Sequence, residues 1–101
     1  MAEKDVAGPL GLAQKAGKLS SGDIGVKEAL AGGKAKLLII ASDAAPNTKK
    51  ELEFLAEKAS VPVITCMKRT ELGLCIGKAP RAAVAVLDGG FAGLIVKKMN
   101  V

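Results

Sequence analysis

The stretch Lys36-Leu37-Leu38-Ile39-Ile40-Ala41 decides the fold of this chain. Beyond its lysine it is continuously apolar and has the length of one strand, which is typical of a central strand covered on both faces. Residues 82–87, Ala-Ala-Val-Ala-Val-Leu, form a second stretch of the same kind. Two such strands predict a sheet with helices packed on both of its faces.

A helical pattern follows the first of these strands. Leu52, Leu55, Ala56 and Ala59 recur at helical spacing, and residues 48–51, Thr-Lys-Lys-Glu, match a capping box directly before them. We therefore predict a helix whose N-terminus is capped by Thr48.

The other predicted elements alternate between helix and strand. Pro9 lies early enough in the first helix to be tolerated in a first turn, and Pro62 marks the start, or an edge position, of a strand. Further helices are predicted over 6–16, 23–31, 70–76 and 88–99, and further strands over 18–21 and 61–65. This order predicts the α/β class and a three-layer α/β/α sandwich around a small mixed sheet, as a single domain over residues 1–101.

The composition excludes several classes of function. The chain of 101 residues has no His, so it lacks a Ser-His or Cys-His base and an imidazole metal ligand. Cys66 and Cys75 alone cannot supply a four-thiolate zinc site, and no glycine-rich phosphate-loop motif occurs. Trp and Tyr are absent, which leaves Phe54 and Phe91 and excludes an aromatic platform for stacked bases. We expect no catalysis, no metal and no cofactor.

The sequence predicts a cytoplasmic protein without a membrane partner. Its longest uninterrupted apolar stretch, residues 82–87, is far shorter than the roughly 20 residues that span a bilayer. Residues 1–5, Met-Ala-Glu-Lys-Asp, contain no basic run that leads into an apolar segment, so no secretory signal is expected.

An excess of positive charge is the remaining general signal. The net charge of +5 suggests an anionic partner, with simple solubility as the alternative. The uncompensated cations flank the predicted helices 70–76 and 23–31; they are Lys68, Arg69, Lys78 and Arg81, and Lys18, Lys27, Lys34 and Lys36. Side by side, the two groups would form a basic lip beside a helix N-terminus, which favours phosphate. The alternative is a scatter of surface lysines.

Acidic residues have mostly structural interpretations. Asp43 and Asp88 each follow a predicted buried strand, where ligands collect in open α/β sheets, but aspartates there are also common turn formers, and we favour that role. Glu51, Glu53 and Glu57 are expected to form ion pairs with lysines of their own helix.

The order of the segments resembles the kink-turn RNA-binding ribosomal-protein family of archaea and eukaryotes. The resemblance lies in residues 22–33 and 35–43, and further in Val61-Pro62-Val63, in Leu72-Gly73 before Ile76-Gly77, and in residues 83–86. The bacterial YlxQ-type branch is most similar, on Ser21-Gly22, Asn47-Thr48-Lys49-Lys50, Ile76-Gly77-Lys78 and Gly90-Phe91-Ala92. Together these segments span nearly the whole chain.

The resemblance implies an α/β/α sandwich that binds a sharply bent internal loop of structured RNA, ribosomal or regulatory, with ribosome association among its expected roles. In the family, the second helix enters the groove beside the kink, and a loop before the Leu-Gly helix contacts a flipped-out nucleotide. Carried over by position, the implied RNA-binding residues are Gly22, Asp23, Ile24, Gly25, Lys27, Glu28, Lys49, Cys66, Met67, Lys68, Arg69 and Arg81. RNA shape and backbone can carry such recognition without an aromatic platform.

The second helix departs from the family's pattern. The positions of the family's Asn and Glu hold Ile24 and Gly25, and the position of its Lys holds Glu28, with Lys27 one residue earlier. These changes predict weaker kink-turn binding, or recognition of a different structured RNA. Gly25, without a side chain, is expected to allow RNA to approach closely.

Other interpretations stay open. The loss of RNA readout also fits a protein-interaction module on the same fold, and a small-molecule or enzymatic role centred on Asp43 and Asp88 is a third hypothesis. Cys66 and Met67 either contact RNA or complete their strand in the core.

Overall fold

The two continuous apolar stretches pair with each other at the centre of the sheet. The computed structural model describes the backbone of residues 2–99 and the side chains of residues 6–99. Within these residues, β2 (Leu37–Ile40) runs antiparallel to β4 (Ala83–Val86), with Leu38 opposite Ala85. Every residue of both strands is buried, as expected for strands covered on both faces.

The remaining strands complete a mixed four-stranded sheet in the order β1-β4-β2-β3. The edge strand β1 (Leu19–Ser21) is antiparallel to β4, and the other edge strand, β3 (Val63–Thr65), is parallel to β2. Pro62 directly precedes β3, so its missing N–H falls at an edge, in agreement with the prediction.

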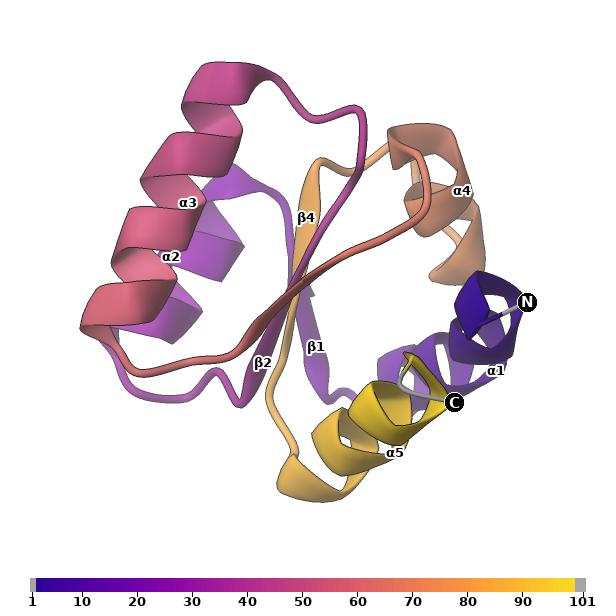
Figure 1. Cartoon of the computed structure of the whole chain (residues 1–101). Coiled ribbons are helices and arrows are strands. Elements are labelled where there is room, and N and C mark those ends of the chain that lie inside the picture. The colour runs from indigo at the N-terminus through magenta and orange to yellow at the C-terminus, as the bar shows by residue number, and fades with distance from the viewer. Residues whose placement is uncertain (1, 100–101) are drawn as a thin grey trace.

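Helices cover both faces of this sheet, which confirms the predicted three-layer α/β/α sandwich (Figure 1). One face carries α2 (Asp23–Ala31) and α3 (Pro46–Lys58). The other carries α1 (Ala2–Lys15), α4 (Arg69–Cys75) and α5 (Gly89–Met99), with α1 packed against both α4 and α5. No helix within residues 2–99 is both long enough and apolar enough to cross a membrane.

Two local predictions are wrong. α3 begins at Pro46 rather than after a Thr48 cap, and the residue before it, Ala45, makes no side-chain capping bond. Proline suits this first position because its φ is already helical and its missing N–H would have no intrahelical partner there. Pro9 lies well inside α1 rather than in a first turn.

Because of the strand directions, three helices begin at the same end of the sheet, where β1, β2 and β3 end. Strands β1, β2 and β3 run the same way and are followed by α2, α3 and α4, while β4 runs the opposite way and begins at that edge. We call this the helix-start edge; it comprises residues 21–24, 42–49, 66–69 and 81–83. The other end of the sheet is the opposite edge.

A glycine in α4 lets the chain fold back closely before β4. Gly73 is buried, and a Cβ at this position would contact the backbone carbonyl of Ala79 and lie 2.9 Å from the carbonyl oxygen of Lys78. These are backbone atoms, which cannot rotate away as a flexible side chain can. In contrast, a Cβ on Gly93 in α5 would meet nothing within 4 Å.

We predict that Gly73→Ala lowers the free energy of unfolding by about 1–3 kcal/mol, the usual range for overpacking. Gly93→Ala, the matched control, should instead stabilise by up to about 1 kcal/mol through helix propensity. Urea unfolding followed by circular dichroism measures both. Equal stabilities for the two variants would contradict the close packing of α4 against the segment that precedes β4.

Candidate nucleic-acid interface

The loop between β3 and α4 is anchored to the end of β2. The backbone N–H and the hydroxyl of Ser42 both donate to the carbonyl oxygen of Met67, at 2.7 and 2.9 Å. Met67 has a φ of +62°, a left-handed conformation that costs a residue with a side chain about 1–2 kcal/mol. The double hydrogen bond stabilises this turn and so fixes the direction in which the next residues leave it.

Asp43 holds the residue at the start of α4. Its carboxylate accepts the backbone N–H of Arg69 at 2.8 Å and lies 3.6 Å from the Arg69 guanidinium, with both side chains about half exposed. The predicted structural role of Asp43 is thereby extended. It orients the loop of residues 66–69, which we call the basic loop, and it partly neutralises Arg69 in that loop.

Two lysines reach the same place from different elements. The Lys49 ammonium, from the first turn of α3, donates to the carbonyl oxygen of Ser42 at 3.3 Å. Lys68 is exposed, its backbone N–H donates to the Glu71 carboxylate at 2.8 Å, and its ammonium has no acidic partner among the described residues. Lys49 and Arg69 thus place two cations at residues 42–43, and Lys68 directly precedes Arg69 in the loop.

Arg81 joins this loop to the start of α2. Its guanidinium donates to the Ser21 hydroxyl at 3.3 Å and to the carbonyl oxygens of Ala79 and Pro80, and its backbone N–H donates to the Arg69 carbonyl. The start of α2 and the basic loop therefore converge. The half-buried Arg81 guanidinium is engaged in these contacts rather than standing free.

Lys27 is neutralised by two carboxylates. Its ammonium lies 3.1 Å from Glu51 of α3 and 3.3 Å from Asp23 of its own helix. Hydrogen bonds to Glu51 and then Asp23 raise the pKa of Lys27 above its ordinary value. The ion-pair partner of Glu51 is thus a lysine on another helix, which corrects the expected pairing of this glutamate within α3.

The side chains of Cys66 and Met67 lie in the core, at 1% and 5% exposure. The burial agrees with the second interpretation, but β3 ends at Thr65, so both residues follow the strand, and Met67 shapes the loop through its backbone. Burial raises the pKa of the neighbouring Cys75 thiol, whose sulfur lies 3.8 Å from the Met67 sulfur. Ile24, in the first turn of α2, is instead 74% exposed.

The glycines at the start of α2 have structural reasons. Gly22 has a φ of +86° and precedes the helix without a side-chain cap. A Cβ on Gly25 would lie 2.6 Å from the Ser20 hydroxyl oxygen, so the missing side chain makes room for β1. Gly25 also lines a surface hollow, and close approach of RNA to this position stays a prediction. Glu28 lies farther along α2, beside a hollow lined also by Ser20 and Lys34.

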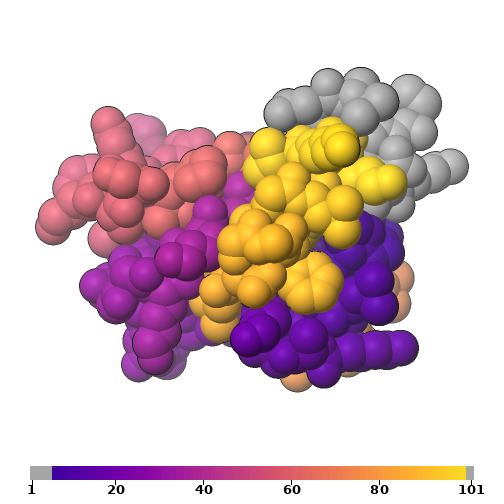
Figure 2. All heavy atoms as spheres, turned by 90° about the horizontal axis from the view of Figure 1, so that it is seen from below, coloured from indigo at the N-terminus to yellow at the C-terminus, as the bar shows by residue number. Residues whose placement is uncertain are grey.

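The predicted single basic lip is split between the two ends of the sheet. Lys18, Lys34 and Lys36 lie at the opposite edge, where the Lys36 N–H donates to the Val86 carbonyl and the Leu87 N–H donates to the Lys18 carbonyl. Figure 2 views the molecule from below, where the segment after α2 and the end of α1 lie on either side of the start of α5. Only Lys27 of this predicted group comes near the helix-start edge.

Asp43 and Asp88 do not form a common centre. Asp88 lies at the opposite edge, where its carboxylate accepts the Phe91 N–H at 2.9 Å and caps α5. Among the residues that the structure describes, no group of three or more acidic, Cys or His side chains is arranged to hold a metal ion.

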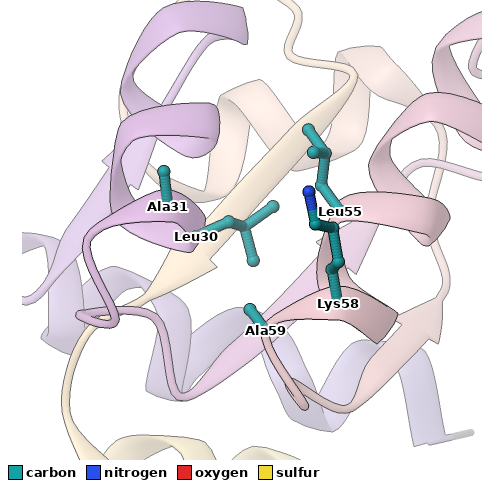
Figure 3. Close-up of a pocket in the computed structure, with 5 residues that line it drawn as sticks. All are labelled: Leu30, Ala31, Leu55, Lys58 and Ala59. Carbon is teal, nitrogen blue, oxygen red and sulfur yellow. The ribbon is translucent and has the colours of Figure 1, made fainter.

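An apolar groove lies between the C-terminal halves of α2 and α3, away from the basic loop. It has a volume of about 280 Å³ and is lined by Leu30, Ala31, Leu55, Lys58 and Ala59. In Figure 3, Leu30 points across the gap toward α3. This groove has no counterpart in the sequence analysis, because its two walls are distant in the chain.

Sequence reasoning missed Ser42, and it missed the long-range partners of Asp43 and Glu51. Ser42 follows the decisive apolar strand directly, which is a place where polar side chains at a sheet edge often anchor a neighbouring loop. The actual partners are 24–26 residues away in sequence, and no local spacing identifies them.

Comparisons with known proteins place the chain in a family. Residues 4–96 match the ribosomal protein L7Ae/L30e/S12e/Gadd45 family. The chain is 36% identical over 91 residues to the RNA-binding protein YlxQ of Bacillus subtilis, which covers 90% of this chain and 91% of that protein.

Two solved structures share the fold. A protein with unknown function from Bacillus halodurans has a TM-score of 0.90 and 33% identity, covering 98% of this chain and 99% of that one. The Giardia lamblia 15.5kD RNA binding protein has a TM-score of 0.83 at 18% identity, covering 98% of this chain and 85% of that one. The chain therefore belongs to the ribosomal protein L7Ae/L30e/S12e/Gadd45 family, within the branch that resembles YlxQ.

Proposed function

We propose that this protein binds structured RNA without catalysis, through its helix-start edge, and that its ligand is a sharply bent internal loop of the kink-turn type in ribosomal or regulatory RNA. The observation that carries the proposal is the contact of Lys49 and Arg69 with residues 42–43, with the exposed Lys68 next to Arg69 in the same loop and the start of α2 nearby. A close group of cations at a rigid edge suits a surface where RNA phosphates are crowded.

The backbone dipoles at the starts of α2 and α3 also favour an anionic partner such as RNA. α2 and α3 both begin at this edge, and neither has a side-chain cap, so N–H groups of their first turns remain available to an anion. The described residues offer a platform of charge and shape rather than of aromatic rings, which matches recognition through backbone and overall form.

The proposal divides the predicted residues by role. Lys49, Lys68 and Arg69 contact phosphates, and the exposed start of α2, with Asp23 and Ile24, meets the groove. Residues that shape this surface from within are Gly22, Gly25, Cys66, Met67 and Arg81. Lys27 contacts phosphate once its ion pairs with Asp23 and Glu51 have opened. Glu28 borders the surface from farther along α2.

The relatives support this class of function. The similar protein from Bacillus subtilis is named an RNA-binding protein, and the family is one of ribosomal proteins. A ribosome-associated or RNA-regulatory role in the cytoplasm follows from that likeness and is part of the proposal. Ile24 and Gly25 lack the groups for bidentate base contacts, each worth about 1–3 kcal/mol by analogy with DNA, so shape rather than base identity dominates.

The double variant Lys68→Ala/Arg69→Ala tests the proposal. Against a hairpin with a kink-turn internal loop, it should bind about tenfold more weakly, and the slope of log K against log salt should become shallower by about 1.4–1.8, because two phosphate contacts are lost. Fluorescence anisotropy at several salt concentrations measures both quantities.

Lys34→Ala/Lys36→Ala is the matched control, since it removes the same charge at the opposite edge. It should leave the slope unchanged. Equal losses for the two double variants would mean that the net charge, and not the helix-start edge, drives binding.

A second candidate function, docking of a protein partner, is favoured by the apolar groove between α2 and α3. The groove lies beside the ends of these helices and leaves the helix-start edge free. An apolar side chain of a partner would fill the space lined by Leu30, Leu55 and Ala59, near the Lys58 ammonium.

Ala31→Glu tests the second candidate, because a buried carboxylate in an apolar contact is costly. If the groove binds a partner, proteins that co-purify with the wild-type chain after nuclease treatment should be lost with this variant, while its affinity for the hairpin stays within about twofold. Co-purification that disappears with nuclease alone would contradict a protein-docking role.

A further inference from the structure

Ile24 stands out among the exposed apolar side chains. The large apolar residues that are exposed in the described part of the chain are Leu12, Ile24, Phe54, Leu74 and Leu94. Phe54 is covered on one side by the Lys58 ammonium, 5.9 Å from the ring centroid. Of the whole set, only Ile24 belongs to the helix-start edge.

The polar side chains around Ile24 are already paired within the protein. Asp23 is paired with Lys27, which is also paired with Glu51, and the Ser21 hydroxyl accepts from Arg81. The tip of α2 therefore presents no unpaired cation among the described residues. Besides the uncapped N–H groups of its first turn, this tip presents Ile24, an apolar residue that is 74% exposed.

The small hollow at the start of α2 does not take up the Ile24 side chain. It measures about 40 Å³ and is lined by Gly22, Asp23, Val26, Thr48 and others at the starts of α2, α3 and β4, but not by Ile24. Because Ile24 is exposed outside this hollow, a partner must contact its side chain from the surface of the molecule.

We infer that Ile24 contacts the face of an unpaired nucleobase in the bound RNA, so that the tip of α2 adds an apolar, base-tolerant contact to the phosphate contacts of the basic loop. The inference rests on the proposed function. RNA is the occupant because Lys49, Lys68 and Arg69 lie at the same edge and complement a polyanion. A side chain without hydrogen-bonding groups cannot distinguish the four bases by their edges.

This assignment also accounts for the burial of the loop's apolar residues. The family resemblance implied that Cys66 and Met67 would contact a flipped-out nucleotide, but both side chains lie in the core. Ile24 supplies an exposed apolar surface near this loop, because Arg81 is hydrogen-bonded both to Arg69 in the loop and to Ser21 just before α2.

Affinity and salt dependence separate the apolar contact from the ionic ones. Ile24→Ala should weaken binding to the kink-turn hairpin about five- to tenfold, the value for burying roughly half of an isoleucine side chain, with an unchanged salt slope. Ile24→Leu should retain wild-type affinity within about twofold. Leu12→Ala, an exposed apolar truncation on the other face of the sheet, is the matched control and should change the affinity less than about twofold.

A double-mutant cycle identifies the base. Each unpaired nucleotide of the hairpin is replaced in turn by an abasic residue, and binding is measured for wild type and for Ile24→Ala. One abasic position should weaken wild-type binding about five- to tenfold and have no further effect on Ile24→Ala. In methyl-labelled protein, the Ile24 resonance should shift upfield on RNA binding, with the buried Ile39 and Ile40 as internal references.

Two results would overturn the inference. The first is that, at every abasic position, the fold-loss of affinity is as large for Ile24→Ala as for wild type, so that no position is coupled to Ile24. The second is that Ile24→Ala binds like wild type while Lys68→Ala/Arg69→Ala still reduces the salt slope. If wild type does not prefer the kink-turn hairpin to an uninterrupted hairpin of equal length, the proposed function fails first, and the inference fails with it.

Discussion

The pairing of β2 with both β4 and β3 is the constraint on which this molecule depends. Because β2 and β3 are parallel and β4 runs against them, the residues that follow β1, β2 and β3 meet at one edge. Three helices begin there, and the loop of residues 66–69 becomes a neighbour of residues 42–43. The bonds from Ser42 and Asp43 then hold this loop in a left-handed turn. Rigidity of this kind lets a small chain present charges in a fixed pattern.

The positive charge at the helix-start edge is partly neutralised by acidic side chains. Arg69 is partly neutralised by Asp43, and Lys27 by Asp23 and Glu51. Lys49, Lys68 and Arg81 form no ion pair with an acidic side chain within the described residues. Surface ion pairs are weak enough to exchange partners, so phosphates can replace the carboxylates at modest cost. Under the proposed function, fit to the shape of the RNA then contributes more to selectivity than raw charge does.

Most of the fold is predictable from the sequence, because the signals are local. Continuous apolar stretches mark the central strands, and helical spacing marks the helices, so errors are confined to starts such as Pro46. The candidate site is less predictable. The partners of Lys27 and Arg69 lie 24 and 26 residues away in the sequence, and burial of Met67 follows from its anchor at Ser42 rather than from its own spacing. The strand directions, which no local pattern reveals, also send Lys18, Lys34 and Lys36 to the opposite edge.

Backbone amide chemical shifts, recorded while a kink-turn hairpin is titrated into labelled protein, locate the RNA-binding surface. If RNA binds the helix-start edge, the largest shifts fall in residues 21–24, 42–49, 66–69 and 81–83, because these segments form one surface. Shifts concentrated around Lys18, Lys34 and Lys36, or around the groove lined by Leu30 and Leu55, would contradict binding at this edge.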